Sequence, residues 1–173
     1  MKQWFMLTVA GRDQPGILAG LSRALYQAGA NLGEAAMARL GDNFTIMLMA
    51  ETEADEVALT RQINPIAQKM QLHVHIDRLE GHLQQRAEPN AQIAVHGADR
   101  PGMVAQVSAA LTAAGLSILD LDSKVGGTAD KPVYIMVIDG YVPGGMQTLE
   151  RALEPIRLSG IEVRLTPVRT SEG

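Results

Sequence analysis

VAGRDQPGILAGLSRALYQAGANL, residues 9–32, is the stretch that decides the fold. It returns 86 residues later as VHGADRPGMVAQVSAALTAAGLSI, residues 95–118. Of the 24 aligned positions, 11 are identical, and most other pairs exchange one apolar residue for another. The identities in the first copy are Val9, Gly11, Asp13, Pro15, Gly16, Ala19, Ser22, Ala24, Leu25, Ala28 and Gly29. Chance composition would not keep this register, so the sequence indicates a tandem duplication.

Each copy has the pattern of a strand, a loop and a helix. An apolar strand ends at a glycine, and Asp-x-Pro-Gly follows it. Proline favours the first helical position, where its missing N–H has no intrahelical partner, so we expect helices from Pro15 and Pro101. Apolar residues at 17, 18, 21, 24, 25 and 28 give the first helix one buried face. Gly29 and Gly115 end the helices, because glycine tolerates the left-handed conformation.

The first half continues to a complete βαββαβ order. We predict strands at 4–10, 31–39, 44–50 and 72–78, and helices at 15–27 and 54–70. Pro65 should kink or restart the second helix, because proline removes a hydrogen bond and clashes with the preceding turn. This order is that of the ferredoxin-like unit. The predicted fold class is therefore α+β, with antiparallel sheets that carry their helices on one face.

The second half repeats this order, so the duplication extends past the quoted stretch. We predict strands at 92–96, 117–125, 133–139 and 161–168, helices at 101–114 and 146–158, and a long hairpin tip at 126–130. The domains are then residues 1–79 and 92–169, joined by a polar linker at 80–91. Residues 169–173 read as a frayed tail.

Composition limits the possible functions. The 173 residues carry a net charge of −4 and include no cysteine, so disulfides and thiolate chemistry are absent. Without a basic cluster or a helix-turn-helix pattern, we expect no direct contact with nucleic acid. No apolar run resembles a signal peptide or a membrane span, which favours a cytoplasmic protein without a membrane partner.

The third strand of each half is apolar on both sides. In the first half Phe44, Ile46 and Leu48 face one way and Met47 and Met49 the other. Strands buried on both faces have such continuous apolar runs. We therefore expect the back of each sheet, with Trp4 and Met6, to be covered by the other repeat or by a second subunit, which favours a homodimer. The alternative is a partly exposed apolar back face.

The paired motifs resemble the ACT domain, a small-molecule-sensing module of amino-acid metabolism. The resemblance rests on Asp-x-Pro-Gly at residues 13–16 and 99–102, and on Gly-x-Asn-Leu and Gly-x-Ser-Ile at 29–32 and 115–118. Two such domains in a chain of this length resemble the glycine cleavage system transcriptional repressor family. That resemblance implies a non-enzymatic regulator of gene expression in glycine or one-carbon metabolism, which binds a glycine-like or serine-like amino acid and acts through a protein partner.

The loop before each first helix is suited to an amino acid. Free N–H groups and the helix dipole there favour a carboxylate, and Gly16 allows close approach to the backbone. Asp13 could accept hydrogen bonds from an ammonium group, and Asn31 offers donors and acceptors. In ACT domains, by resemblance, effectors lie near this loop at an interface between two domains. The candidate ligand-binding residues are Asp13, Gln14, Gly16, Ile17, Leu18, Asn31, Asp99, Gly102, Met103, Val104 and Ser117.

Other interpretations compete with this one. An aspartate before a helix often caps the backbone N–H groups of its own loop, and Pro-Gly can serve only the turn. The whole chain could then be a dimerisation module without a ligand. His73 and His75 share one strand face but lack further ligands at metal-binding spacing, and His96 precedes the second loop. We expect no metal, no cofactor and no enzymatic activity, because no nucleophile–base pair or ligand set emerges.

Overall fold

The computed structural model describes residues 1–80, 87–98 and 101–168. The chain divides into two compact units, Met1–Leu83 (unit 1) and Gln84–Gly173 (unit 2). This division falls inside the segment predicted as a linker, of which residues 81–86 lie outside the described ranges, as does the predicted tail at 169–173. The two units are described one at a time below.

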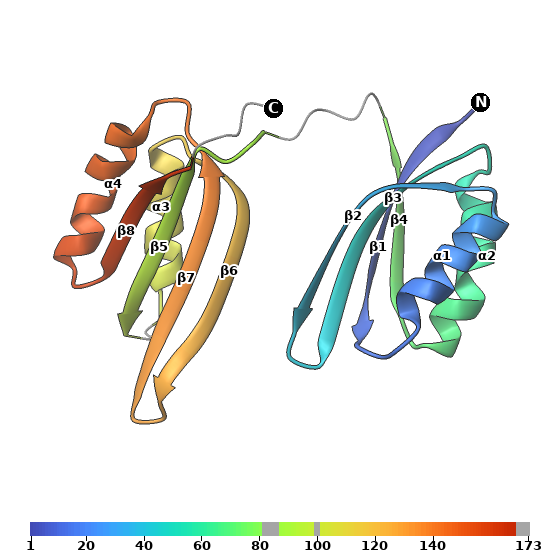
Figure 1. The fold of residues 1–173 in the computed structure, drawn as a ribbon, viewed down its shortest axis with the longest axis horizontal. Coiled ribbons are helices and arrows are strands. Elements are labelled where there is room, and N and C mark those ends of the chain that lie inside the picture. Colours follow the sequence, from blue (N-terminus) through green and yellow to red (C-terminus); the bar gives the residue numbers. More distant parts are fainter. Residues whose placement is uncertain (81–86, 99–100, 169–173) are drawn as a thin grey trace. The chain divides into compact units, whose positions relative to one another are not determined.

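Unit 1 is a four-stranded antiparallel sheet with two helices on one face (Figure 1). The strands lie in the order β2-β3-β1-β4, so β1 is central and β2 and β4 form the edges. The helix α1 connects β1 with β2 and passes β3, and α2 connects β3 with β4 and passes β1. Both helices are therefore crossovers, and they lie on the same face of the sheet (Figure 1). The elements are β1 (Gln3–Arg12), α1 (Ile17–Gln27), β2 (Asn31–Leu40), β3 (Asn43–Thr52), α2 (Glu56–Lys69) and β4 (His73–Leu79).

Unit 2 repeats this topology, with the strand order β6-β7-β5-β8. Its elements are β5 (Ala91–Ala98), α3 (Met103–Ala113), β6 (Ser117–Thr128), β7 (Lys131–Tyr141), α4 (Met146–Leu158) and β8 (Glu162–Pro167). Two antiparallel sheets in the same order, each with helices on one face, confirm the predicted pair of ferredoxin-like βαββαβ domains. The α+β fold class is likewise confirmed.

Each unit has its own core between the sheet and its helices. In unit 1 alternate β1 residues point at the helices, and Phe5, Leu7 and Val9 are fully buried. In unit 2, Ile93 and Val95 do the same from β5. Most helical positions predicted for the buried face complete these cores, as Leu21 and Leu25 show, but Leu18 is 53% exposed and lies outside the core. The period-2 pattern of the strands and the helical spacing therefore identified the core faces correctly.

The second helix of unit 1 corrects one expectation. We expected α2 to kink or restart at Pro65. It does not restart, because one helix runs through that residue from Glu56 to Lys69, and the kink stays a prediction. Proline leaves the carbonyl of Arg61, four residues earlier, without its intrahelical donor. Arg61 and Pro65 are both exposed, so water can take that place. The helix also begins later than predicted, where the Asp55 carboxylate accepts a hydrogen bond of 2.8 Å from Ala58 N.

The hairpin of unit 2 differs from the expected long tip. β6 continues to Thr128 and β7 begins at Lys131, so the strands stay paired through Gly126 and Gly127 and the turn is shorter. Gly127 has a φ of 84°. The glycines therefore belong to the ladder and not to an open loop.

The faces of the sheets opposite the helices are not covered by an element of their own unit, as far as the described residues go (Figure 1). In unit 1 the indole of Trp4 packs over Gly33 and next to Met49, which is buried. Met47 nevertheless stays 49% exposed. That a second subunit or the other unit covers these faces therefore stays a prediction.

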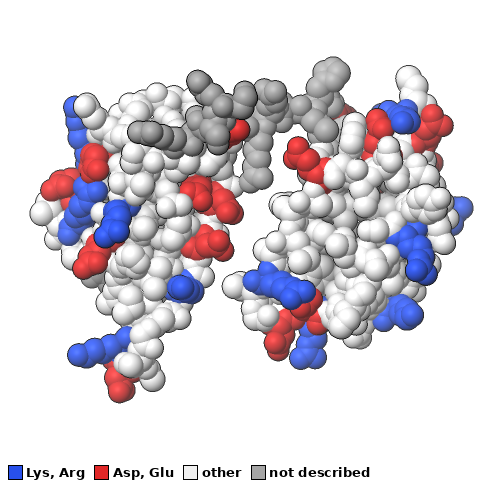
Figure 2. All heavy atoms as spheres, in the orientation of Figure 1, with Lys and Arg blue, Asp and Glu red and all other residues white. Residues whose placement is uncertain are grey.

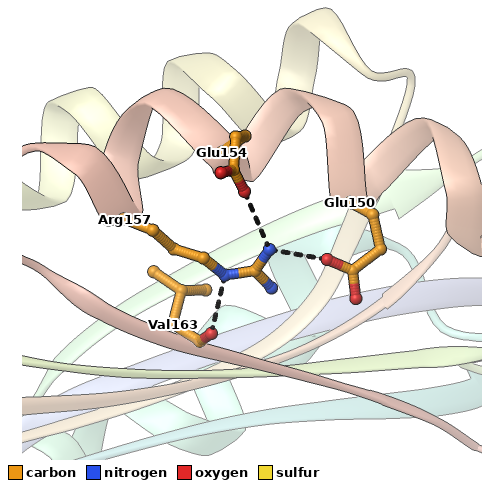
Figure 3. A network of polar contacts seen from close by, with 4 residues as sticks. All are labelled: Glu150, Glu154, Arg157 and Val163. Atoms are coloured by element: carbon orange, nitrogen blue, oxygen red, sulfur yellow. Dashed lines mark hydrogen bonds and ion pairs between the residues drawn. The ribbon is translucent and has the colours of Figure 1, made fainter.

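Arg157 joins α4, the last helix of unit 2, to β8, its last strand, through a hydrogen bond (Figure 3). Arg157 on α4 donates a hydrogen bond of 3.1 Å from Nε to the carbonyl oxygen of Val163 on β8. Its Nη1 atom donates a hydrogen bond of 2.6 Å to Oε2 of Glu150 and lies 3.6 Å from Oε2 of Glu154. The hydrogen bond with Glu150 is the main cause that raises the pKa of Arg157 above its ordinary value. This cluster joins elements within one domain and lies outside the predicted ligand loops.

Candidate functional site

The loop after β1 is held by two hydrogen bonds from its own first residues. The backbone N–H of Asp13 donates to the carbonyl oxygen of Asp42 at 2.8 Å, in the β2–β3 hairpin. The side-chain amide of Gln14 donates to the carbonyl oxygen of Met70 at 2.8 Å, at the end of α2. These bonds fix the loop against both neighbours. Gln14 therefore anchors the loop through its amide.

Among the residues that the structure describes, no side chain caps the first helix of either unit. Gly16 and Gly102 precede these helices in the left-handed conformation, with φ of 91° and 88°. The interpretation in which Asp13 caps the N–H groups of its own loop is therefore wrong for unit 1. The requirement for glycine is conformational, because an added Cβ would meet nothing within 4 Å at either position.

The carboxylate of Asp13 instead pairs with an arginine that sequence reasoning missed. Oδ2 of Asp13 lies 3.2 Å from Nε of Arg39, near the end of β2. The register places Arg39 opposite Phe44, which in turn faces Gly11, so Arg39 is on the helix side of the sheet. The side chains are 32% and 63% exposed, respectively. This ion pair is therefore open to solvent and to a ligand.

Beside the ion pair lies a hollow of about 500 Å³. It is lined by Asp13, Gln14, Pro15, Gly16, Ile17, Leu18, Met37, Arg39, Phe44 and Ile46. Ile17, Phe44 and Ile46 belong to the buried core, while Leu18 and Met37 are about half exposed. The hollow thus combines a charged pair of opposite signs with apolar walls. Such a mixture, with a few convergent polar groups, is typical of small-molecule sites.

Asn31, also predicted as a ligand residue, lies elsewhere in unit 1. It begins β2 opposite Glu51, whereas Arg39 is near the other end of the same strand. Asn31 lines a second hollow of about 410 Å³, next to the ion pair that Lys2 makes with Glu51 at 3.2 Å. Asp13 lies beside Asp42 in the β2–β3 hairpin, whereas Asn31 lies at the start of β2, opposite Glu51. The two residues are therefore at opposite ends of the sheet. One unit alone does not bring them together.

Unit 2 has other residues at the described positions that correspond to the site of unit 1. Of the predicted residues, Asp99 lies outside the described ranges. Met103 is buried and belongs to the core, whereas Val104 is 41% exposed. Ser117 begins β6 opposite Tyr141, as Asn31 begins β2. At the place of Arg39 stands Val125, opposite Tyr134, so the arginine of the hollow in unit 1 has no counterpart there.

The histidines singled out in the sequence do not form a site. His75 Nε2 lies 3.1 Å from Asp77 Oδ1, with both side chains more than half exposed. No group of three or more His, Asp or Glu side chains among the described residues could hold a metal ion. His96 is exposed on β5. Lysines and arginines lie scattered among acidic residues on the visible face of each unit (Figure 2).

Comparison with known proteins agrees with this fold. Residues 3–77 match the family model of the ACT domain. This match lies within unit 1, and unit 2 repeats the topology of unit 1. It resembles the glycine cleavage system transcriptional repressors of Escherichia coli strain K12 and Shigella flexneri, each 22% identical over 124 residues. That match covers 71% of this chain and 65% of the length of either relative.

Two solved structures share the fold over nearly the whole chain. One is a protein of unknown function from Galdieria sulphuraria, with a TM-score of 0.81, 23% identity and coverage of 98% of this chain and 100% of that one. The other is a presumed glycine cleavage system transcriptional repressor, with a TM-score of 0.74, 17% identity and coverage of 98% and 99%. None of the helices in the described residues is both long and apolar enough to cross a bilayer.

Proposed function

We propose that this protein is a non-enzymatic regulator that binds a free amino acid in the hollow of unit 1 and passes the signal to a protein partner. Its output is control of gene expression in amino-acid metabolism. The ACT domain match and the names of the curated relatives support the regulatory role. The scattered charge on the visible surface favours a protein partner over direct contact with nucleic acid (Figure 2).

The observation that carries the proposal is the Asp13–Arg39 pair beside the hollow. A free amino acid has one carboxylate and one ammonium group next to each other. The guanidinium of Arg39 can donate two parallel hydrogen bonds to the ligand carboxylate, and the carboxylate of Asp13 can accept hydrogen bonds from the ligand ammonium group. An exposed ion pair of this kind contributes only about 0–1 kcal/mol to folding. A zwitterion can therefore replace the direct contact at little cost.

Binding reaches the partner through the elements that the loop joins. The loop touches the β2–β3 hairpin through Asp13 and the end of α2 through Gln14. A ligand that prefers one arrangement of these elements shifts their conformational balance by its differential affinity. In ACT domains, effectors lie at interfaces between domains. A homodimer that adds a residue such as Asn31 from the second copy would complete the site in that manner.

Thermal melting of the full chain with each standard amino acid tests the proposed function. A ligand at about 100 times its Kd adds about 2.7 kcal/mol to the stability of the folded state, which is a measurable rise in Tm. The matched controls are the amine and the carboxylic acid that each lack one of the two charged groups. We expect the amino acid to raise Tm and the two control compounds to leave it unchanged. The absence of a shift with any amino acid at millimolar concentration would contradict ligand binding.

The exposed back of unit 1 favours a second candidate function, that of a dimerisation module without a ligand. Met47 is half exposed on that face, and every residue of β2 is exposed along an unpaired edge. Exposed apolar surface and an unpaired edge strand are features of surfaces that bind other chains. This candidate predicts a dimer whose Tm does not respond to amino acids, so the same melting series separates it from the first.

A further inference from the structure

The size and lining of the unit 1 hollow bear on which amino acid it takes. About 500 Å³ is the share of roughly seventeen water molecules in the liquid, at about 30 Å³ each. Glycine or serine would fill a small part of that space. The rest would stay filled with water against Ile17, Phe44 and Ile46, which are apolar and belong to the core.

The spacing along β2 gives the ligand a direction. Arg39 lies opposite Phe44, and Met37 lies opposite Ile46 on the same face of the sheet. Residues two apart on a strand are separated by roughly 7 Å. An amino acid whose carboxylate binds Arg39 can therefore extend its side chain along the strand toward Met37 and Ile46. Such a side chain must be several carbon atoms long to reach them, and it meets apolar groups throughout.

We propose that the ligand of unit 1 is an α-amino acid with a large apolar side chain, of the size of leucine, methionine or phenylalanine, and not glycine or serine. This inference rests on the proposed function and names its ligand class. The Asp13–Arg39 pair binds the two charged groups, and Met37 with Ile46 and Phe44 forms the side-chain pocket. Burial of an apolar side chain of that size strengthens binding by roughly ten- to hundredfold relative to glycine.

Unit 2 has different residues at the positions that correspond to Arg39 and Met37. Val125 stands in the place of Arg39, and Ser123 stands in the place of Met37, opposite Met136. Unit 2 thus has neither the cation nor the long apolar side chain at these positions. The preference for a large apolar amino acid accordingly belongs to unit 1.

The test compares glycine, serine, leucine, methionine and phenylalanine by equilibrium dialysis with the full chain, with thermal melting as a second measurement. The Met37→Gln variant keeps the side-chain length but makes the wall polar. Met37 is 54% exposed, so the exchange should not disturb folding. Val57→Gln is the control, because Val57 is 65% exposed on α2 and does not line the hollow.

We expect leucine, methionine or phenylalanine to bind at least tenfold more tightly than glycine. Met37→Gln should reduce this advantage several-fold and leave glycine binding unchanged, while Val57→Gln should bind as the unchanged chain does. Equal or tighter binding of glycine or serine would overturn this inference and leave the proposed function standing. Unchanged leucine binding by a folded Met37→Gln variant would overturn the assigned pocket. If no amino acid binds, the proposed function itself fails.

Discussion

A single residue on β2 distinguishes the two halves of this duplicated chain. Arg39 pairs with Asp13 in unit 1, and Val125 stands at the matching place in unit 2. Strand residues at matching positions of a repeat usually share their packing role, but an exposed position is free to change. The chemistry of the first loop therefore depends on a residue outside the repeated motif that defines the fold.

Replacement of Arg39 by glutamine should weaken ligand binding with little change in stability. The lost ion pair is exposed and contributes at most about 1 kcal/mol, whereas a charge-assisted bond to the ligand carboxylate contributes more, so affinity should fall at least about tenfold. Dialysis measures the first effect and urea unfolding the second. Arg61→Gln on the exposed face of α2 is the control and should bind normally. Comparable losses of binding in both variants would argue against a specific role for Arg39.

Replacement of Gly16 by alanine should destabilise unit 1 by about 1–2 kcal/mol. The cause is the left-handed backbone, with a φ of 91°, because space for a Cβ is available. Asparagine tolerates this conformation better than alanine, so Gly16→Asn should lose less. Urea unfolding of the two variants gives the comparison. If alanine were as stable as glycine, strain at this position would not explain the residue.

At the scale of the elements, local signals predicted most of the fold. Gly29 follows the end of the first helix with a φ of 67°, but that helix begins at Ile17 and not at Pro15 as expected, because Gly16 is its N-cap. Period-2 alternation marked β1 and its buried residues. Pro65 does not restart α2, contrary to one expectation. Its effect depends on whether water can reach the carbonyl oxygen of Arg61, and that exposure is a property of the folded unit.

The candidate site was predictable only in part. Asp13 and Gly16 follow from their motif and do line the hollow. Arg39 does not, because its place beside Asp13 depends on the register of β2 against β3 and on the hairpin between them. Asn31 was expected close to the loop, but the direction of β2 puts it at the far end of the sheet.

Another prediction concerns the contact between α4 and β8. Arg157→Met should destabilise unit 2 by about 1 kcal/mol, because it removes the hydrogen bond to Val163 and the ion pair with Glu150. The pKa of Arg157 is raised in the folded state, so its contribution is complete below the unfolded pKa and is lost only as pH rises through the folded one.

Both of these pKa values lie far above neutral, so the loss should be equal at pH 7 and pH 9. Urea unfolding at the two pH values measures it. Arg151→Met is the control, since Arg151 is exposed on the same helix. A loss that disappears between pH 7 and pH 9 would show that another group is responsible.

At the scale of the whole molecule, we expect two chains per particle. The back of unit 1 leaves Met47 exposed, and the whole length of β2 forms an unpaired, exposed edge. Association would cover both features. Size-exclusion chromatography with light scattering, at micromolar concentrations, should give twice the chain mass of 18.5 kDa. A particle with the mass of a single chain would contradict this expectation.

Isothermal titration calorimetry of the full chain tests the central claim, which is that the Asp13–Arg39 hollow of unit 1 binds a free amino acid. The titrant is the amino acid that binds best in the dialysis series. We expect one ligand per chain, and binding at least about tenfold weaker for Arg39→Gln than for the unchanged protein. Two ligands per chain, or binding by Arg39→Gln as tight as that of the unchanged protein, would contradict it.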